Sequence, residues 1–536
     1  ERVALMPRAL LGLLLLSLLA SAQPLVLGTY PQKFRAFYPL GDPAAPKAAQ
    51  LHVMAPVPPR CPIRNVRLIH RSADGAVWVA GTAAVARHTT DRGWEYFAGR
   101  RYLPEGEVQD FLVESPDAVW VRTDTAWSRI ELRPMTLEAK AAEFEKRIAL
   151  RHVRYGLVAD SELTRPGDLA SNRKVPSDND GLWTAIYAGA ECFRYAATHS
   201  EEARANARRS IEALLRLEQI TGQPGFPARS VIRAGDYRPP GGIWRQTSDS
   251  TFEWKADTSS DEIVGHLLAY ALYYDLVASD REKPRLRAVA DRILSGILDH
   301  GYNLVDRVTG QPTTWGKWSP EYFADPKTGS DVALNSVEIL SHLLVAYHLT
   351  GQGRFLDAYH TLIQMHGYAQ NVTRYRELRR QINYSDEELA MLSYYPLLLY
   401  EKDAGLRRIY LEGLRQWWDN ERREKNPLWI FIYQFATGTR EYTPDAVWTL
   451  ARYPMDLITW RVNNLPRADL TWVSDRDRFN RGQVRELLPP DERPVQRWNA
   501  NPFVPNGGNG GRGDDDGAAF LLPYWVGRYH GFIQER

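Results

Sequence analysis

From residue 180 onward, apolar residues recur at spacings of three and four, the period of an amphipathic α-helix. Polar and charged residues fill the intervening positions and the breaks between segments. The pattern predicts helices over 181–198, 207–220, 262–278, 286–302, 335–350, 355–368, 387–402, 406–420, 426–438, 445–462 and 518–533. Ten or eleven helices of this kind form five or six helical hairpins.

The helices alternate in character along the chain. One member of each pair is apolar on nearly all sides with a few acids and histidines, and the next is amphipathic and rich in Arg and Glu. A helix that is apolar all round is buried, and an amphipathic helix covers it. The predicted fold is therefore mainly α: an (α/α) toroid of five to six hairpins, with a small antiparallel β module before it.

The predicted loops differ in length by position. Links from an inner to an outer helix are short, whereas three links from an outer to an inner helix are long: 221–257, 302–332 and 465–518. Long ordered loops in a compact domain are usually functional. In a toroid they all lie at the end where the inner helices begin, so this end is the predicted site.

Residues 64–131 alternate between apolar and polar positions, which is typical of half-buried strands. DGAVWVAGT at 74–82 is echoed by DAVWVRT at 117–123, with Trp78 and Trp120 at corresponding positions. The repeat resembles the blades of two-component-regulator propellers. Such propellers carry many blades and this segment has room for two, so we expect a small sheet module and no closed propeller.

The first residues are typical of an export signal. Arg2 and Arg8 precede the apolar run ALLGLLLLSLLA, and Ala20-Ser21-Ala22 forms a small-residue cleavage pattern. We expect a signal peptide over 1–22, a linker or extended segment over 23–63, the β module over 64–135 and the toroid over 140–536. A periplasmic or secreted protein without a membrane span after cleavage follows from this.

Composition limits the classes of partner. The chain has 67 basic and 65 acidic residues and no long basic stripe, so we expect no nucleic-acid partner. Its two cysteines, Cys61 and Cys192, fall in different predicted domains, which favours free thiols. The 17 Trp and 27 Tyr are typical of sugar-binding clefts but equally of large cores.

Polar groups gather where three inner helices begin. SDNDGLW places Asp178 and Asp180 at the first helix, and WKADTSSDEIVGH places Asp261, Glu262 and His266 at the second. The third, LNSVEILSHLL, carries Asn335, Glu338 and His342 on one face. Glu262 with His266 and Glu338 with His342 are each four residues apart, so each pair shares a helix face. Both faces are predicted to point toward the ring axis.

Three interpretations of these groups stay open. They could form structural Glu–His hydrogen bonds, a carbohydrate-active acid/base site, or a site for a divalent cation. Acids after Ser or Thr are also ordinary chemistry of a helix start. No metal or other cofactor is expected at the inner-helix starts. Calcium at Asp514, Asp515 and Asp516 is a further candidate, with a solvated flexible loop as the favoured reading there.

The hairpin pattern, the acids at inner-helix starts and the Trp-rich loops resemble the six-hairpin glycosidase superfamily over about 140–536. The resemblance implies a carbohydrate substrate and a glycoside hydrolase with two carboxyl groups flanking the scissile bond. The catalytic candidates are Asp180, Asp261, Glu262, His266 and Glu338. The substrate-binding candidates are Asp178, Arg229, Trp254, Trp315, Trp318, Asn335 and His342.

Two alternatives remain. A polysaccharide lyase or epimerase acting on uronic-acid sugars would use a Tyr or His base, for which Tyr394, Tyr395 and His342 are available, and Arg229 would contact the carboxylate. A non-catalytic glycan-binding surface protein would need the tryptophans but not the acids.

Overall fold

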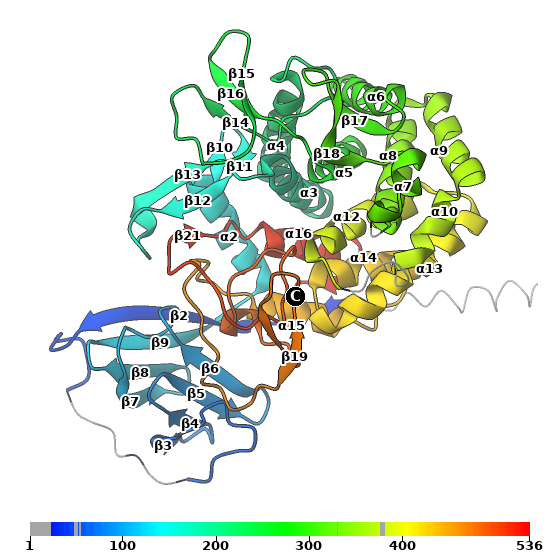
Figure 1. The fold of residues 1–536 in the computed structure, drawn as a ribbon. Coiled ribbons are helices and arrows are strands. Elements are labelled where there is room, and N and C mark those ends of the chain that lie inside the picture. The colour runs from blue at the N-terminus through cyan, green and yellow to red at the C-terminus, as the bar shows by residue number, and fades with distance from the viewer. Residues whose placement is uncertain (1–22, 48–51, 53–54, 330, 376–380) are drawn as a thin grey trace, which may run out of the picture.

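The computed structural model describes residues 23–47, 52, 55–329, 331–375 and 381–536. The predicted signal peptide, 1–22, lies outside the described residues. The described part is mainly α-helical with several small sheets, which confirms the mainly-α part of the predicted fold. Figure 1 shows the two sheets formed within residues 30–135 gathered on one side of a large helical body.

Six long helices form the inner layer of the helical body in the described part of the chain. They contact one another in chain order, and the last contacts the first, so the contacts close into a ring. The inner helices are α3 (Asp180–Thr198), α5 (Ser260–Leu276), α8 (Val332–Thr350), α12 (Tyr384–Tyr400), α14 (Pro427–Thr437) and α16 (Ala518–Tyr529). Their side chains are buried on nearly every face, as expected for helices that are apolar all round.

A second set of helices packs outside this ring, each against one or two inner helices. This outer layer comprises α2 (Leu137–Arg151), α4 (Glu201–Gln219), α6 (Lys283–Asp299), α9 (Gly353–His366), α13 (Ala404–Glu421) and α15 (Thr443–Arg452). In each of these the buried residues recur at helical spacing on one side, as in Leu286, Val289 and Ile293 of α6. The outer helix that covers α16 is α2, which lies far earlier in the chain.

One predicted helix is shorter than expected. The prediction ran over 445–462, but α15 ends at Arg452, and Tyr453 takes an extended conformation before Pro454. A residue before proline is disfavoured in the helical region, which explains the end. Residues 453–517 then form a long strap across the helical body.

Two four-stranded antiparallel sheets make up the N-terminal β module. The first has the order β3-β4-β5-β6 and the second β2-β9-β8-β7. Trp78 lies on β4 and Trp120 on β8, so the repeated motif supplies an inner strand of each sheet. The second sheet also takes β2 from the segment predicted as linker, paired with β9 along ten residues. Bounds are β2 (Tyr30–Pro39), β3 (Leu68–Arg71), β4 (Val77–Ala80), β5 (Ala84–Thr89), β6 (Gly93–Ala98), β7 (Val108–Ser115), β8 (Ala118–Thr123) and β9 (Ala126–Met135).

Short sheets decorate the loops. Those between the helices are β10 (Val153–Arg154) with β11 (Leu157–Val158), β12 (Asp160–Leu163) with β13 (Asn172–Val175) and β21 (Gly513–Asp514), β14 (Ser230–Arg233) and β15 (Trp244–Gln246) with β16 (Phe252–Lys255), β17 (Asn303–Asp306) with β18 (Gln311–Lys317), and β19 (Trp472–Arg476) with β20 (Gly482–Val484). Near the termini, β1 (Leu25–Val26) pairs with β22 (Ile533–Gln534). Among the described residues, two short α-helices, α7 (Pro320–Ala324) and α10 (Tyr368–Asn371), also lie in the loops.

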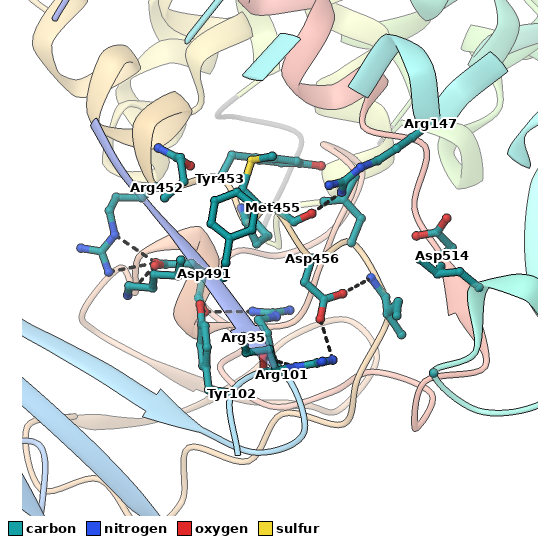
Figure 2. A pocket seen from close by; sticks show the side chains of 18 of the residues that line it. Arg35, Arg101, Tyr102, Arg147, Arg452, Tyr453, Met455, Asp456, Asp491 and Asp514 are labelled. Carbon is teal, nitrogen blue, oxygen red and sulfur yellow. Dashed lines mark hydrogen bonds and ion pairs between the residues drawn. The ribbon is translucent and has the colours of Figure 1, made fainter. Parts of the chain in front are cut away.

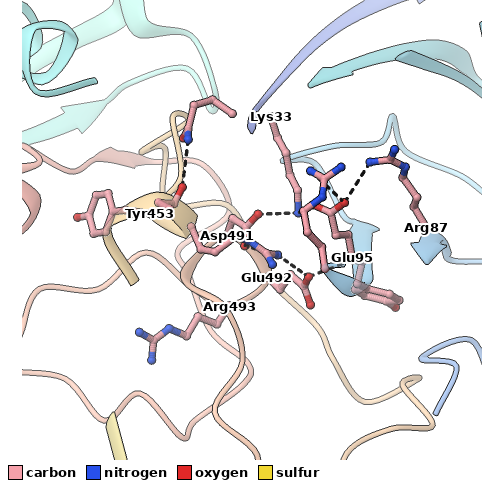
Figure 3. Close-up of polar contacts among 12 residues, drawn as sticks. Lys33, Arg87, Glu95, Tyr453, Asp491, Glu492 and Arg493 are labelled. Atoms are coloured by element: carbon pink, nitrogen blue, oxygen red, sulfur yellow. Dashed lines mark hydrogen bonds and ion pairs between the residues drawn. The ribbon is translucent and has the colours of Figure 1, made fainter. Parts of the chain in front are cut away.

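The sheets meet the helical body across buried charges and a cavity (Figure 2). Asp491 of the strap accepts from Lys33 of β2 at 2.6 Å and from Arg452 of α15 at 2.9 Å (Figure 3). Glu492 pairs with Arg452 and Arg467 at 2.9 and 2.8 Å. All five side chains except that of Arg452 are at least nine-tenths buried, so these pairs fix the β module onto the strap.

Two further features bear on the predictions. Cys61 and Cys192 are both free, as predicted. Among the described residues one helix, α8, is long and apolar enough to cross a membrane, but 89% of its most apolar stretch is buried inside the protein.

Candidate functional site

A polar cavity of about 450 Å³ opens where three inner helices begin. The first turns of α5, α8 and α12 form its floor, and the loops at 220–259 and 300–331 reach its rim. The two loops therefore lie at the same end of the ring, as predicted. The lining residues are Arg229, Ser260, Asp261, Trp315, Tyr322, Asp331, Leu334, Asn335, Gln381, Ile382, Asn383, Ser385, Asp386, Leu389 and Arg478. Four of the predicted site residues are among them: Arg229, Asp261, Trp315 and Asn335.

The start of α5 is fixed by local hydrogen bonds. Ser259 and Glu262 form a capping box, in which a carboxyl oxygen of Glu262 accepts from the Ser259 backbone N–H at 3.1 Å. This satisfies backbone N–H groups that a helix start leaves unpaired. Asp261, which lies between these two residues in the first turn, is turned to the cavity. Its carboxylate accepts from the Asn179 side-chain amide at 3.2 Å and from the Ser259 hydroxyl at 2.8 Å. The stretch WKADTSSDEIVGH thus combines a helix cap with a carboxylate in the cavity.

Asp257 links the two loops above α5. It has a left-handed backbone with φ of 56°, and its carboxylate accepts from the backbone N–H and the hydroxyl of Thr314, both at 2.9 Å. Thr314 directly precedes Trp315. The strained turn at Asp257 therefore holds β18 and its tryptophan at the rim.

Arg229 lies at the cavity wall with its guanidinium held by neutral acceptors. It donates to the Asp178 carbonyl at 2.9 Å, the Asn179 side-chain carbonyl at 2.7 Å and the Asp257 carbonyl at 3.3 Å. In the described part of the chain it forms no ion pair with a carboxylate within 4 Å. Its positive charge is thus available to an anionic group in the cavity.

The three predicted tryptophans differ in exposure. Trp315 is 58% exposed and lines the cavity, so its ring face can stack on a ligand. Trp254 and Trp318 are buried. Trp254 packs against Phe226, and Trp318 donates its indole N–H to Glu338 at 2.7 Å. Of the three, only Trp315 offers an open face.

Three fully buried carboxyl groups lie beneath the cavity floor. Burial raises the pKa of Glu262 to about 8 and that of Glu388 to about 8, and it raises the pKa of Glu338 well above the ordinary value. The charge of Asp261 raises all three further. Each has one carboxyl oxygen without a hydrogen-bond partner among the described residues. Burial therefore favours the protonated form of all three, which is the form that can donate a proton.

The two predicted Glu–His pairs do not share one environment. His266 lies against α3 and α4: a Cβ on Gly181 would fall 2.8 Å from its Cε1, and the Leu214 carbonyl influences its pKa. His342 instead lies edge-on to Trp318, with ring centroids 5.7 Å apart. Burial lowers the pKa of His266 to about 4 and that of His342 to about 3. These shifts favour the neutral form of both histidines. Glu262 and His266 share a helix face, as predicted, but this face is turned to α3 and not to the ring axis.

The acids at the start of α3 are engaged elsewhere. Asp180 is fully buried; it accepts from Ser177 at 2.7 Å and from Arg154 at 3.0 Å, with Ser230 as a further donor at 2.5 Å. These contacts hold the start of α3. Asp178 is exposed and ion-paired with Lys255, which keeps the pKa of its carboxyl low. Neither lines the cavity.

The remaining candidates also lie away from the cavity. The Tyr395 hydroxyl contacts His530 at 3.0 Å, near the C-terminal ends of the inner helices. Tyr394 is buried, and a Cβ on Gly413 of the outer helix α13 would fall 2.7 Å from its hydroxyl. Asp514, Asp515 and Asp516 are buried rather than in a solvated loop, since Arg151 and Arg497 pair with them. No group of three or more His, Cys, Asp or Glu in the described ranges is placed to hold a metal.

Sequence reasoning missed the contribution of α12. Ser385 and Asp386 line the cavity just as Ser260 and Asp261 do. The signal was present: Ser-Asp-Glu begins both helices, at 260–262 and at 385–387. Arg478, from the loop between β19 and β20, was also missed, because nothing in its local sequence indicates where the strap lies.

Comparisons with known proteins find no matching family model and no curated protein with a matching sequence. Among solved structures, the fold is similar to a D-mannose isomerase, with a TM-score of 0.39 and 10% identity over 74% of this chain and 96% of that one. It is also similar to AaCel9A in complex with cellobiose-like isofagomine, with a TM-score of 0.38 and 11% identity over 85% of this chain and 96% of the other. Both scores are below 0.5, so what these proteins do is not carried over to this chain.

Proposed function

We propose that the protein is an exported carbohydrate-active enzyme, a glycoside hydrolase on a poly- or oligosaccharide, with its site in the cavity at the starts of α5, α8 and α12. The ring of six inner helices and its outer layer is then an (α/α) toroid. The observation that carries the proposal is an accessible carboxylate, Asp261, beside an exposed tryptophan in the cavity wall, with buried carboxyls close enough for its charge to raise their pKa. Glycoside hydrolysis needs this combination of one ionised and one protonated carboxyl group.

The roles follow from the environment of each group. Asp261, held by Asn179 and Ser259, is the carboxylate that either attacks the sugar at the scissile bond or activates a water molecule. Glu388 and Glu338 are the candidates for the proton donor, because burial and the Asp261 charge keep them protonated. Trp315 would stack on a sugar ring, and Asn335 would hydrogen-bond a hydroxyl. Asp180 has no role in this proposal beyond holding α3.

Two cations at the wall point to the kind of sugar. Arg229 and Arg478 both line the cavity. Guanidinium groups bind carboxylates with charge-assisted hydrogen bonds, so an acidic saccharide would place its carboxylate at these two arginines and away from Asp261, Asp331 and Asp386, which also line the cavity. The same pair would serve a lyase or epimerase of uronic-acid sugars, but the candidate bases for that chemistry, Tyr394, Tyr395 and His342, lie outside the cavity.

The test is incubation of the purified protein with a panel of neutral and acidic polysaccharides. Two readouts are followed together: new reducing ends and the ultraviolet absorbance of a new carbon–carbon double bond. The proposal expects reducing ends without the absorbance. The absorbance would identify a lyase, and saturable binding without either signal would identify a glycan-binding protein; each outcome overturns the hydrolase.

A further inference from the structure

A second cavity, of about 320 Å³, lies far from the starts of α5, α8 and α12, between the β module and the helical body (Figure 2). Its walls come from β2, the loop after β6, the outer helix α2 and the strap from residue 453. A cavity of this size is at the lower end of the range for small-molecule sites. None of its lining residues belongs to the proposed sugar site.

The charge of these walls is unbalanced. Six cationic side chains line the cavity against three acidic ones, an excess of three cations. The cations are Lys33, Arg35, Arg101, Arg147, Arg151 and Arg452, and the acids are Asp456, Asp491 and Asp514.

Each of the three acids already forms an ion pair with one or two of these cations. Asp491 is shared by Lys33 and Arg452, as described above. Asp456 accepts from Arg35 at 3.1 Å, and also from the Trp460 indole at 2.9 Å. Asp514 pairs with Arg151 at 2.5 Å. The carboxylates of the cavity therefore leave the charges of Arg101 and Arg147 without a partner of opposite sign.

Arg101 and Arg147 are bound only by backbone carbonyls in the described part of the chain. Arg101, 3% exposed, donates from one nitrogen to the carbonyls of Asp491 at 3.0 Å and Arg493 at 2.8 Å. Its Nε and second Nη are buried without a hydrogen-bond partner among the described residues. Arg147, which is only partly buried, donates to the Met455 carbonyl. A guanidinium has five N–H donors, so most of the donors of Arg147 stay available.

The electrostatic environment supports an unmet positive charge here. Burial lowers the pKa of Arg147 and the neighbouring Arg151 lowers it further, and the opposing effect of Asp514 and Asp456 does not restore it. Burial also lowers the pKa of Arg35, which its ion pair with Asp456 raises only in part and repulsion from Arg100 lowers further. Desolvated cations that repel one another are costly, and an anion placed among them offsets that cost.

We propose that this cavity binds a small organic molecule bearing an oxyanion, either a carboxylate or a sulfate or phosphate ester. Arg147 and Arg35 contact the anionic group, and Arg101 supplies buried positive charge behind it. The anion bridges segments that are far apart in sequence: β2, α2 and the strap. Binding therefore stabilises the attachment of the β module to the helical body, because a ligand that binds only the folded state raises its stability.

The test is calorimetric titration of the full chain with three probes: sodium glucuronate, glucose 6-phosphate and glucose 6-sulfate. Glucose is the neutral control. Binding of at least one anionic probe with no binding of glucose is expected, and the preferred probe identifies the anion. Affinity should fall as ionic strength rises, since charge attraction is screened. Absence of binding by all three probes at millimolar concentration, or equal binding of glucose, would overturn the proposal.

Variants assign the site. Arg147→Gln is expected to weaken binding about ten- to a hundredfold, the scale of a lost hydrogen bond to a charged group, and Arg147→Lys less. Arg216→Gln is the matched control, because Arg216 is also an arginine on an outer helix that donates to a backbone carbonyl, here of Tyr155. Equal weakening by Arg216→Gln would contradict the proposal. If Arg147→Gln does not fold, Arg35→Gln takes its place with the same expected loss. Binding here is measured without turnover, so failure at this site leaves the hydrolase proposal intact and the reverse also holds.

Discussion

Glu388 shows most clearly how burial sets the chemistry of a single residue in this protein. Its side chain is 1% exposed, and burial raises its pKa from 4.5 to about 8. The unfolded chain therefore releases this proton at lower pH than the folded chain. The stability that goes with the protonated form is fully present below pH 4.5 and is lost as pH rises through about 8. Burial also raises the pKa of Glu262, so its contribution to stability is likewise lost as pH rises.

Glu388→Gln is expected to remove the loss of stability that occurs as pH rises. Between about pH 5 and about pH 9 the wild type should lose on the order of 4 kcal/mol more unfolding free energy than the variant, at about 1.4 kcal/mol per pKa unit. Denaturant unfolding at both pH values measures the difference. Glu201→Gln, at an exposed position, is the control and should follow the wild type. Parallel decline of Glu388→Gln and the wild type would show that Glu388 does not titrate from a buried site.

At the scale of elements, the close approach of α3 and α5 depends on glycine. Gly181 faces α5, where an added Cβ would lie 2.8 Å from His266 Cε1 and 3.2 Å from Glu262 Cγ. Gly265 faces back, with an added Cβ 3.0 Å from the Leu182 Cα. These two glycines let the helices pack closely enough to bury the histidine and the glutamate together.

Gly181→Ala is therefore expected to destabilise the protein by about 1–3 kcal/mol, the usual cost of overpacking. Gly296→Ala is the matched control, since Gly296 lies inside α6 with nothing within 4 Å of an added Cβ. It should stabilise by up to about 1 kcal/mol, because alanine favours the helix. Thermal and denaturant melting compare the two. A neutral Gly181→Ala would mean that the α3–α5 contact is looser than described.

The elements were predictable from sequence to very different degrees. The six inner helices could be predicted from the spacing of apolar residues, because a fully buried helix needs apolar side chains on every turn. The side on which an acid points was not predictable: Asp180 is used inside the protein, whereas Asp261 faces the cavity. The strand β2 was missed as well, because its partner β9 lies about ninety residues further along the chain.

At the scale of the whole molecule, buried ion pairs connect the β module to the helical body. Asp491 is the centre of this contact, 5% exposed and shared by Lys33 of β2 and Arg452 of α15. These cations hold the pKa of Asp491 well below its ordinary value despite its burial. Its contribution to stability is present above pH 3.8 and is lost as pH falls further.

Asp491→Asn should lower the unfolding free energy at neutral pH by about 3–5 kcal/mol, because it removes the nearest carboxylate of the buried Lys33 and one of the two carboxylates that pair with Arg452. Asp280→Asn, at a fully exposed position, should leave it unchanged. Differential scanning calorimetry of both variants measures the effect. Equal melting of Asp491→Asn and the wild type would contradict the role given to this contact.

The central claim, that the cavity at the inner-helix starts performs carboxylate catalysis on a saccharide, is tested most directly with Asp261. Once the polysaccharide panel has identified a substrate, turnover and melting temperature are measured for the wild type, Asp261→Asn and the exposed control Asp280→Asn. Asp261 lies in the first turn of α5 behind the Ser259 cap, so a purely structural role through the helix dipole predicts a loss of stability of at most about 1 kcal/mol and unchanged turnover. The account predicts a near-normal melting temperature for Asp261→Asn with turnover reduced about a hundredfold or more, and full turnover for Asp280→Asn. Full activity of Asp261→Asn would contradict it.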